Sequence, residues 1–173
     1  MSFKKMVMLL LFLISCSGKA SFILLPMDEI SQQNHLKAYG ITYWCLDKNY
    51  KAYWLLNYRG GSFLLPDTDQ IRKECQIRGV SFEILSDGEQ EAILNDISSP
   101  SQNMESVLLE KAPKIAVYTP KGKQPWDDAV TLVLTYAEIP FTPIYDQEVL
   151  SDNMLVHQTL LTVKLSRYAA ALR

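Results

Sequence analysis

Apolar, strand-like runs alternate with helical patterns along most of this chain, and that alternation constrains its fold more than any other feature. The runs FILLPM, at 22–27, and IAVYT, at 115–119, are typical of strands covered on both faces. Each run is followed by a helical pattern and then by another apolar run. Strands that alternate with helices predict an α/β fold with a mainly parallel sheet. We therefore expect two βαβ units, over 22–58 and 115–145.

The stretch DEISQQNHLKAYGITYWCLDKN, which follows the first apolar run, is predicted as a helix. Leu36, Tyr39, Tyr43 and Leu46 recur at steps of three and four, as residues on one helix face do. Gly40 weakens this helix, because glycine has a low helix propensity. The segment ITYWCL within it also has the composition of a strand, which competes with the helix.

Further elements are expected between the two units. SFLLP is predicted as a short strand and VSFEIL, at 80–85, as an alternating strand. Asp67 and Gly79 are the expected N-cap and C-terminal stop of a helix in DTDQIRKECQIRG. SDGEQEAILNDI and NMESVLLEKA are each predicted as helices, the second ended by Pro113.

The N-terminus has the composition of an export signal rather than of a folded element. Lys4 and Lys5 precede an apolar run at 6–14, and small and polar residues follow it. The run is too short to cross a hydrocarbon core as a helix. Two processing routes stay open: cleavage after Ala20, or a lipobox, LISC, in which a lipidated Cys16 anchors the chain to a membrane. The expected location is the periplasm, or the membrane surface if Cys16 is lipidated.

Export sets the redox context of Cys45 and Cys75. A disulfide between them is permitted in an oxidising compartment, and two buried free thiols are the alternative. The chain has no CxxC pair and no Cys/His cluster, so neither a metal site nor a cofactor is expected. Its net charge of −2 gives no general basic field, which argues against nucleic acid as a partner.

Polar residues follow the expected strands at the points where those strands end. In open, parallel α/β sheets the carboxyl ends of the strands share one edge, and ligands bind there. The sequence therefore predicts a rim that binds an unidentified small molecule. The candidate residues are Asp28, Glu29, Asn57, Arg59, Gly60, Gly61, Lys121, Lys123, Gln124 and Asp146.

Structural roles are the alternative for these residues. Asp28 and Glu29 suit a helix N-cap as well as an acid–base or metal-binding pair. Arg59 and the two glycines after it suit a phosphate or carboxylate, and equally a tight turn. The loop TPKGKQPW has no hydroxyl residue after Lys123, unlike a P-loop, so an ordinary strand-to-helix turn is favoured. GxSxG and HExxH are absent, and no catalytic residue is assigned.

The stretches NHLKAYG, LLNYRGGSF and GKQPWDDAVTL resemble an exported bacterial family that is labelled asparagine synthetase B. The resemblance covers roughly 22–150, and because members of that family are usually far longer, it implies that this chain is an N-terminal portion. The second βαβ unit resembles, more weakly, the opening of class I amidotransferase-like domains. The activity in the label is not expected here. A glutamine-dependent synthetase has a cysteine at its mature N-terminus, whereas residue 2 is Ser2, and the SGGxDS loop for ATP is absent.

The expected organisation follows. A signal peptide occupies 1–20, a first α/β unit 21–112, the start of an amidotransferase-like unit 113–150, and a divergent tail 151–173. The expected class is an incomplete sheet of the flavodoxin-like or class I amidotransferase-like kind. The predicted function is an exported protein that binds a ligand at its strand ends and has no complete active site. The alternative is a fragment of an amidotransferase-like or hydrolase enzyme whose catalytic residues lie downstream.

Overall fold

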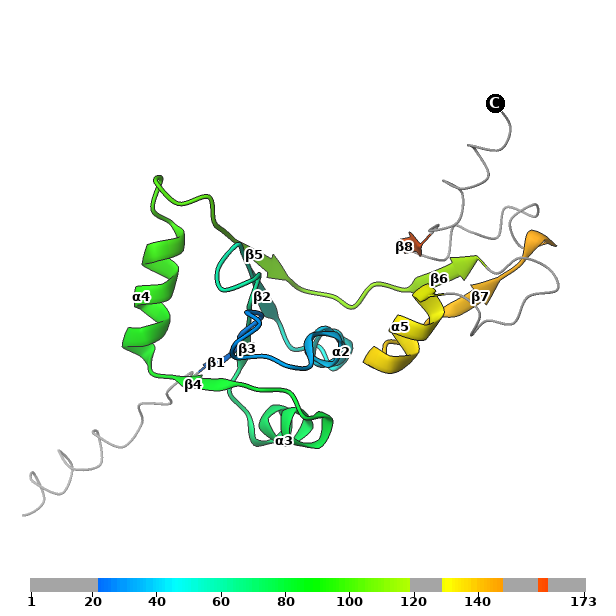
Figure 1. Cartoon of the computed structure of the whole chain (residues 1–173), viewed down its shortest axis with the longest axis horizontal. Coiled ribbons are helices and arrows are strands. Elements are labelled where there is room, and N and C mark those ends of the chain that lie inside the picture. Colours follow the sequence, from blue (N-terminus) through cyan, green and yellow to red (C-terminus); the bar gives the residue numbers. More distant parts are fainter. Residues whose placement is uncertain (1–21, 119–128, 148–158, 162–173) are drawn as a thin grey trace, which may run out of the picture.

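The computed structural model describes residues 22–118, 129–147 and 159–161, which form two sheets with their helices (Figure 1). The expected signal peptide, with Cys16, and most of the expected tail lie outside these ranges. None of the helices in the described ranges has the length and apolar character needed to cross a membrane.

The larger sheet is antiparallel throughout, so the predicted mainly parallel, flavodoxin-like sheet is wrong. Its strands lie in the order β4-β1-β3-β2-β5, and every neighbouring pair is antiparallel. The strands are β1 (Phe22–Leu25), β2 (Ala52–Leu56), β3 (Phe63–Pro66), β4 (Glu83–Leu85) and β5 (Glu105–Leu109).

The short connection between β2 and β3 explains the antiparallel arrangement. Residues 57–62 join the two strands, and a parallel connection needs a crossover of a dozen or more residues. β3 therefore turns back beside β2 and lies between β2 and β1. As a result β1 and β2 run in the same direction, as the expected first βαβ unit requires, but they are not neighbours.

β5 corrects a second prediction, because NMESVLLEKA contains a strand and not a helix. Its five residues pair with β2 from Ala52↔Leu109 to Leu56↔Glu105. The burial alternates along Val107, Leu108 and Leu109, with Leu108 the most exposed of the three. A short apolar segment fits either element by its pattern, and pairing with β2 decides between them here.

Helices cover both faces of the antiparallel sheet (Figure 1). They are α2 (His35–Asp47) and α3 (Asp69–Arg78) on one face and α4 (Asp87–Ile97) on the other. β1 is buried on both sides, since Ile23 and Leu25 face α2 and α3 while Leu24 packs on the side of α4.

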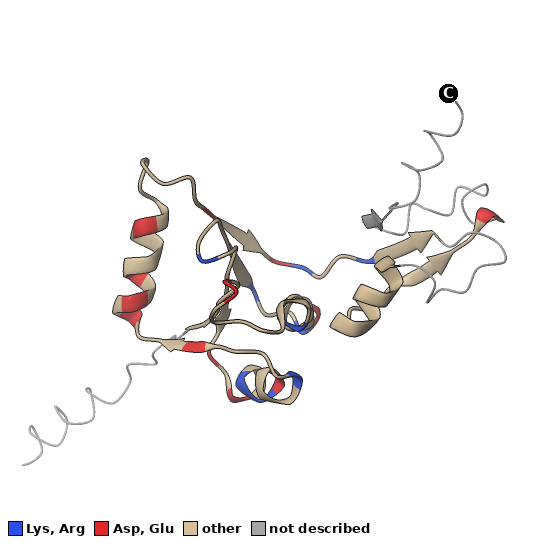
Figure 2. Cartoon of the chain, in the orientation of Figure 1, with Lys and Arg blue, Asp and Glu red and all other residues tan. Residues whose placement is uncertain are grey.

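The helices differ in charge: α4 carries acidic side chains and no Lys or Arg, whereas α3 carries both signs (Figure 2).

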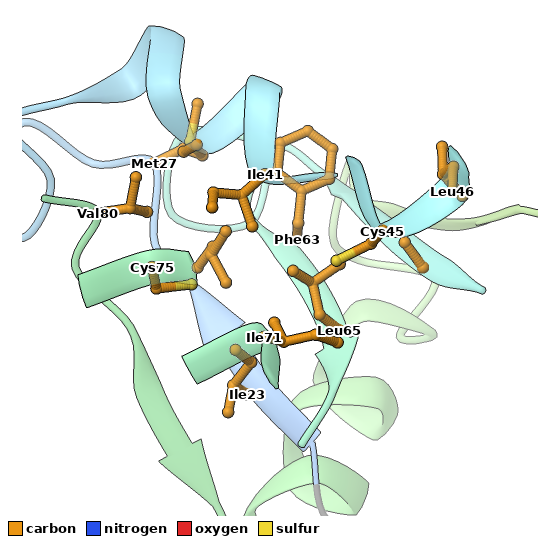
Figure 3. Close-up of a cluster of buried hydrophobic side chains, with 13 residues drawn as sticks. Ile23, Met27, Ile41, Cys45, Leu46, Phe63, Leu65, Ile71, Cys75 and Val80 are labelled. Carbon is orange, nitrogen blue, oxygen red and sulfur yellow. The ribbon is translucent and has the colours of Figure 1, made fainter. Parts of the chain in front are cut away.

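The main hydrophobic core lies between this sheet and the helices α2 and α3, and the side chains of Cys45 and Cys75 point into it (Figure 3). Burial of each large aliphatic side chain contributes roughly 1.5–3 kcal/mol. The members of this core that are at most 3% exposed are Ile23, Leu25, Ala38, Ile41, Cys45, Ala52, Phe63, Leu65, Ile71 and Cys75.

α2 buries only part of the face that its larger residues indicate, since Leu46 is 7% exposed and lies in the core. Leu36 and Tyr39 are 37% and 42% exposed, whereas Ala38, Ile41 and Cys45 are fully buried. The helix continues through ITYWCL, so the strand composition of that segment does not prevail.

The ends of α3 agree with the sequence in part. Gly79 ends the helix in a left-handed conformation, with φ of 65°, as predicted. The N-cap is Thr68 rather than Asp67, because the Thr68 side chain accepts the N–H of Ile71. Asp67 instead forms an ion pair with Arg72.

The second sheet is parallel, with strand order β7-β6-β8. Its elements are β6 (Ile115–Tyr118), α5 (Ala129–Ala137), β7 (Thr142–Ile144) and β8 (Thr159–Leu161). β6, α5 and β7 form the βαβ unit expected over 115–145.

α2 and α5 pack closely and join the two sheets (Figure 1). At the crossing a Cβ on Gly40 would lie 1.8 Å from the carbonyl oxygen of Ala137, so only glycine allows this approach. Beside this contact, Oε1 of Glu138 accepts a hydrogen bond from Nζ of Lys37 at 2.5 Å. Oε2 of Glu138 lies 3.4 Å from Nε of Arg78. Gly40, which the sequence marks as a weak point of the helix, is thus a contact residue.

Candidate functional site

A polar cluster forms where the expected rim lies, at one edge of the antiparallel sheet. β1 and β2 run in the same direction on either side of β3, so their carboxyl ends reach the same edge. Asp28 follows β1, Arg59 follows β2, and Nε of Arg59 donates to Oδ2 of Asp28 at 3.0 Å. The two residues therefore meet, although not through the parallel sheet that predicted their meeting.

The other N–H groups of Arg59 also bind residues of this chain. Nη1 and Nη2 each donate to one carboxylate oxygen of Glu83, both at 2.9 Å, and Nη2 also donates to Oγ of Ser31 at 2.9 Å. We call Asp28, Ser31, Arg59 and Glu83 the Arg59 clasp. It joins the segment after β1, the turn after β2 and the start of β4. Because Glu83 already forms the bidentate pair with the guanidinium, the clasp works as a structural tie and not as an anion site.

The protonation of the clasp fits this structural role. Hydrogen bonding by Ser31, followed by the contact with Arg59, lowers the pKa of Asp28 from 3.8 to about 2. The hydrogen bond from Arg59 to Glu83 raises the pKa of the guanidinium further. Asp28 is therefore ionised across the neutral range and does not suit a general acid.

The turn that carries Arg59 has an unusual backbone. Asn57, Arg59, Gly60 and Gly61 all have positive φ, at 60°, 44°, 81° and 91°. The carbonyl of Arg59 accepts the N–H of Met27 at 3.1 Å, and a Cβ on Gly60 would lie 2.3 Å from the Met27 oxygen. The two glycines thus allow a tight turn that packs closely against the residues after β1.

The remaining candidates at this edge are not brought into the clasp. Glu29 is exposed. The side-chain amide of Asn57 donates to the carbonyl of Asn103 at 2.7 Å, which ties the turn to the segment before β5. The carbonyl of Gly61 accepts the indole N–H of Trp54 at 3.1 Å. These contacts are again within the fold.

A second candidate site lies at the carboxyl end of the parallel sheet. The hydroxyl of Tyr118, the last residue of β6, donates to Oδ1 of Asp146, which follows β7. Lys121, Lys123 and Gln124 follow Tyr118 in the sequence and lie outside the described residues. Of the predicted rim in this unit, the structure therefore places Asp146 beside Tyr118.

The strand order makes this end distinctive. β6 is central, with β7 parallel on one side and β8 parallel on the other. The chain passes through α5 to β7, and β8 is added later on the opposite side of β6. The strand order therefore reverses between β6 and β8, and ligands bind at such a switch point, outside the carboxyl ends of the strands, in open α/β sheets.

The two described cysteines do not form a reactive site. Cys45 on α2 and Cys75 on α3 are free, fully buried thiols. Burial raises the pKa of each thiol to about 12, so neither is a thiolate at neutral pH. The open alternative of two buried free thiols matches this arrangement.

Three residues of these two sites are not among the candidates that the sequence predicts. The sequence does contain a signal for Ser31, because this residue lies close after Asp28, and Asp side chains favour local turns. In the structure the backbone N–H of Ser31 donates to Oδ1 of Asp28. Tyr118 was read only as a strand residue. Glu83 had no signal, because its place depends on the pairing of β4 with β1.

The described residues contain no group of three or more His, Cys, Asp or Glu side chains that could hold a metal ion. Comparison of the chain with protein-family models, with curated proteins and with solved structures finds no match.

Proposed function

We propose that this chain is an exported binding protein whose site for a small polar ligand lies at the carboxyl end of β6. The strand order β7-β6-β8 carries the proposal, because it creates a switch point at that end of the parallel sheet. The Arg59 clasp, by contrast, uses its polar groups within the fold.

The polar groups at this end, together with those that follow β6 in the sequence, suggest the chemistry of the ligand. Asp146 supplies a carboxylate and Tyr118 a hydroxyl. Lys121 and Lys123 follow Tyr118 closely in the sequence and supply positive charge. A carboxylate together with lysines suits a ligand that carries both an ammonium and an acidic group. An amino acid is the simplest ligand of this class.

The export part of the proposal rests on the N-terminal sequence. Two lysines before an apolar run, followed by small residues, support secretion. The periplasm is the proposed compartment, and lipidation of Cys16 is the route by which the protein would be held at a membrane.

Thermal unfolding of the purified chain in the presence of the twenty common L-amino acids, each tested singly, tests the function. A ligand at 100 times its Kd stabilises a protein by about 2.7 kcal/mol, which raises Tm by roughly 5–10 °C at this size. Asp146→Asn should abolish the shift. Asp96→Asn, an exposed aspartate on α4, is the matched control and should keep it.

Two results would contradict the proposal. The first is that no amino acid raises the Tm of the unmodified chain. The second is that Asp146→Asn and Asp96→Asn both show the same shift as the unmodified chain. The second result would place the ligand away from the carboxyl end of β6.

A further inference from the structure

A hollow lies at the opposite end of the parallel sheet, where the strands begin. Its volume is about 240 Å³. The lining residues come from α2, from the linker before β6, from the first residue of β6, and from the loop into β7 with the first residue of that strand. They are Tyr43, Lys114, Ile115, Pro140, Phe141 and Thr142.

The size of the hollow limits its occupant. Pockets for drug-sized ligands measure roughly 300–1,000 Å³. At 240 Å³ the hollow suits a smaller molecule, of about one ring with a short substituent.

Among the described residues, the lining combines an apolar wall with one cation. Phe141 and Tyr43 are half-buried and pack against the core of the parallel sheet, and Ile115 is 9% exposed. Lys114 is exposed and forms no ion pair with any described residue, and Thr142 adds an exposed hydroxyl. Apolar surface beside one positive charge and one hydroxyl favours an apolar body with one carboxylate.

Tyr43 shapes the hollow without adding a charge. Its hydroxyl donates to the carbonyl of Pro113 at 3.0 Å, which fixes the ring against the linker. Burial, and then the charge of Asp47, raises the pKa of Tyr43, so the phenol is neutral at physiological pH. The ring therefore presents an uncharged wall, and Lys114 supplies a positive charge to the part of the lining that the structure describes.

We propose that this hollow binds a small aromatic carboxylate, with the ring against Phe141 and Pro140 and the carboxylate on Lys114 and Thr142. The site lies at the amino ends of β6 and β7 and shares no residue with the proposed site at their carboxyl ends. Failure of either proposal therefore leaves the other intact.

Nuclear magnetic resonance titration of the full chain with benzoate tests this site. Acetate, which lacks the ring, and benzyl alcohol, which lacks the charge, serve as paired probes. Benzoate should give saturable shifts of the amides of Lys114, Ile115 and Thr142. Both paired probes should bind more weakly, and benzyl alcohol, which loses the ion pair, by roughly fivefold.

Comparing Lys114→Gln with Lys111→Gln distinguishes a direct contact of Lys114 with the carboxylate from a general electrostatic attraction of the linker for anions. Both lysines are exposed and lie between β5 and β6, and of the two Lys114 lines the hollow. Lys114→Gln should weaken benzoate by roughly fivefold, and Lys111→Gln should leave it unchanged. Absence of saturable shifts at the lining, or equal weakening by the two variants, would overturn the proposal.

Discussion

Replacing Gly40 with alanine should separate α5 from α2 while leaving the antiparallel sheet folded. The new Cβ would lie 1.8 Å from the carbonyl oxygen and 2.9 Å from the carbonyl carbon of Ala137. Both are backbone atoms, so no side-chain rotation relieves the overlap. To restore an ordinary contact, α5 must move away by roughly 1.5 Å.

The cost follows from three contributions. Overpacking of this kind costs typically 1–3 kcal/mol, and a clash with backbone lies at the upper end. The retreat of α5 also breaks the contacts of Lys37 with Glu138 and of Tyr136 with Asn34, which contribute roughly 0.5–1.5 kcal/mol each. Alanine regains about 1 kcal/mol of helix propensity over glycine. We expect a net loss of about 3–5 kcal/mol in the free energy of unfolding.

Gly88→Ala is the matched control, because Gly88 lies in α4 and a Cβ there would meet nothing within 4 Å. This change should stabilise the protein by about 0.5–1 kcal/mol through helix propensity alone. Urea unfolding followed by circular dichroism measures both variants. The two substitutions should shift the midpoint in opposite directions. A Gly40→Ala protein as stable as the Gly88→Ala protein would refute the close packing of α2 on α5.

Three further predictions concern the ends and turns of the antiparallel unit. Ser86→Ala removes the hydroxyl of the capping box that starts α4 and should lower the free energy of unfolding by about 1 kcal/mol in urea; no change would mean that the cap is not formed. The pKa of Asp28 falls from 3.8 to about 2 on folding, so its stabilising effect is complete above pH 3.8 and is lost as the pH falls towards 2. Acid unfolding of Asp28→Asn should lack this dependence, and identical acid profiles would contradict the clasp. Gly60→Ala, with φ of 81° and a Cβ 2.3 Å from the Met27 oxygen, should cost more than about 2 kcal/mol, whereas Gly79→Ala, with φ of 65° and open space, should cost about 1 kcal/mol; equal losses in urea would show that the contact with Met27 is absent.

The direction of the strands was the main error of the sequence analysis, and its cause is physical. Helix α2 lies between β1 and β2, which indicates a parallel pair, and those strands do run in the same direction. The sequence did not show that β3 would lie between them. The short connection at 57–62 could have shown that β3 is antiparallel to β2, since it is too short for a crossover.

The second unit was predictable because its elements are local. β6, α5 and β7 follow one another, and the parallel pairing of β6 with β7 needs only the helix between them. The role of Gly40 was not predictable in this way. Its contact is Ala137, which is distant in the sequence, and an isolated glycine in a helical pattern indicates only a loss of propensity.

The candidate site was predicted in part for the same reason. Asp28 and Arg59 were named from the ends of their strands and do meet, because both strands end at one edge. Their use within the fold depends on Glu83, which the pairing of β4 with β1 brings to the edge. A pattern along one segment carries no information about such a partner.

The central claim is that the ligand site lies at the carboxyl end of β6. The most direct test is to titrate the protein with an amino acid that raises its Tm and to map the chemical-shift changes of the protein amides. We predict that the largest amide shifts fall on Tyr118 and around Asp146, and that Asp146→Asn removes them. Shifts centred instead on the turn at 57–61, with Tyr118 and Asp146 unchanged, would contradict the account and would return the site to the antiparallel sheet.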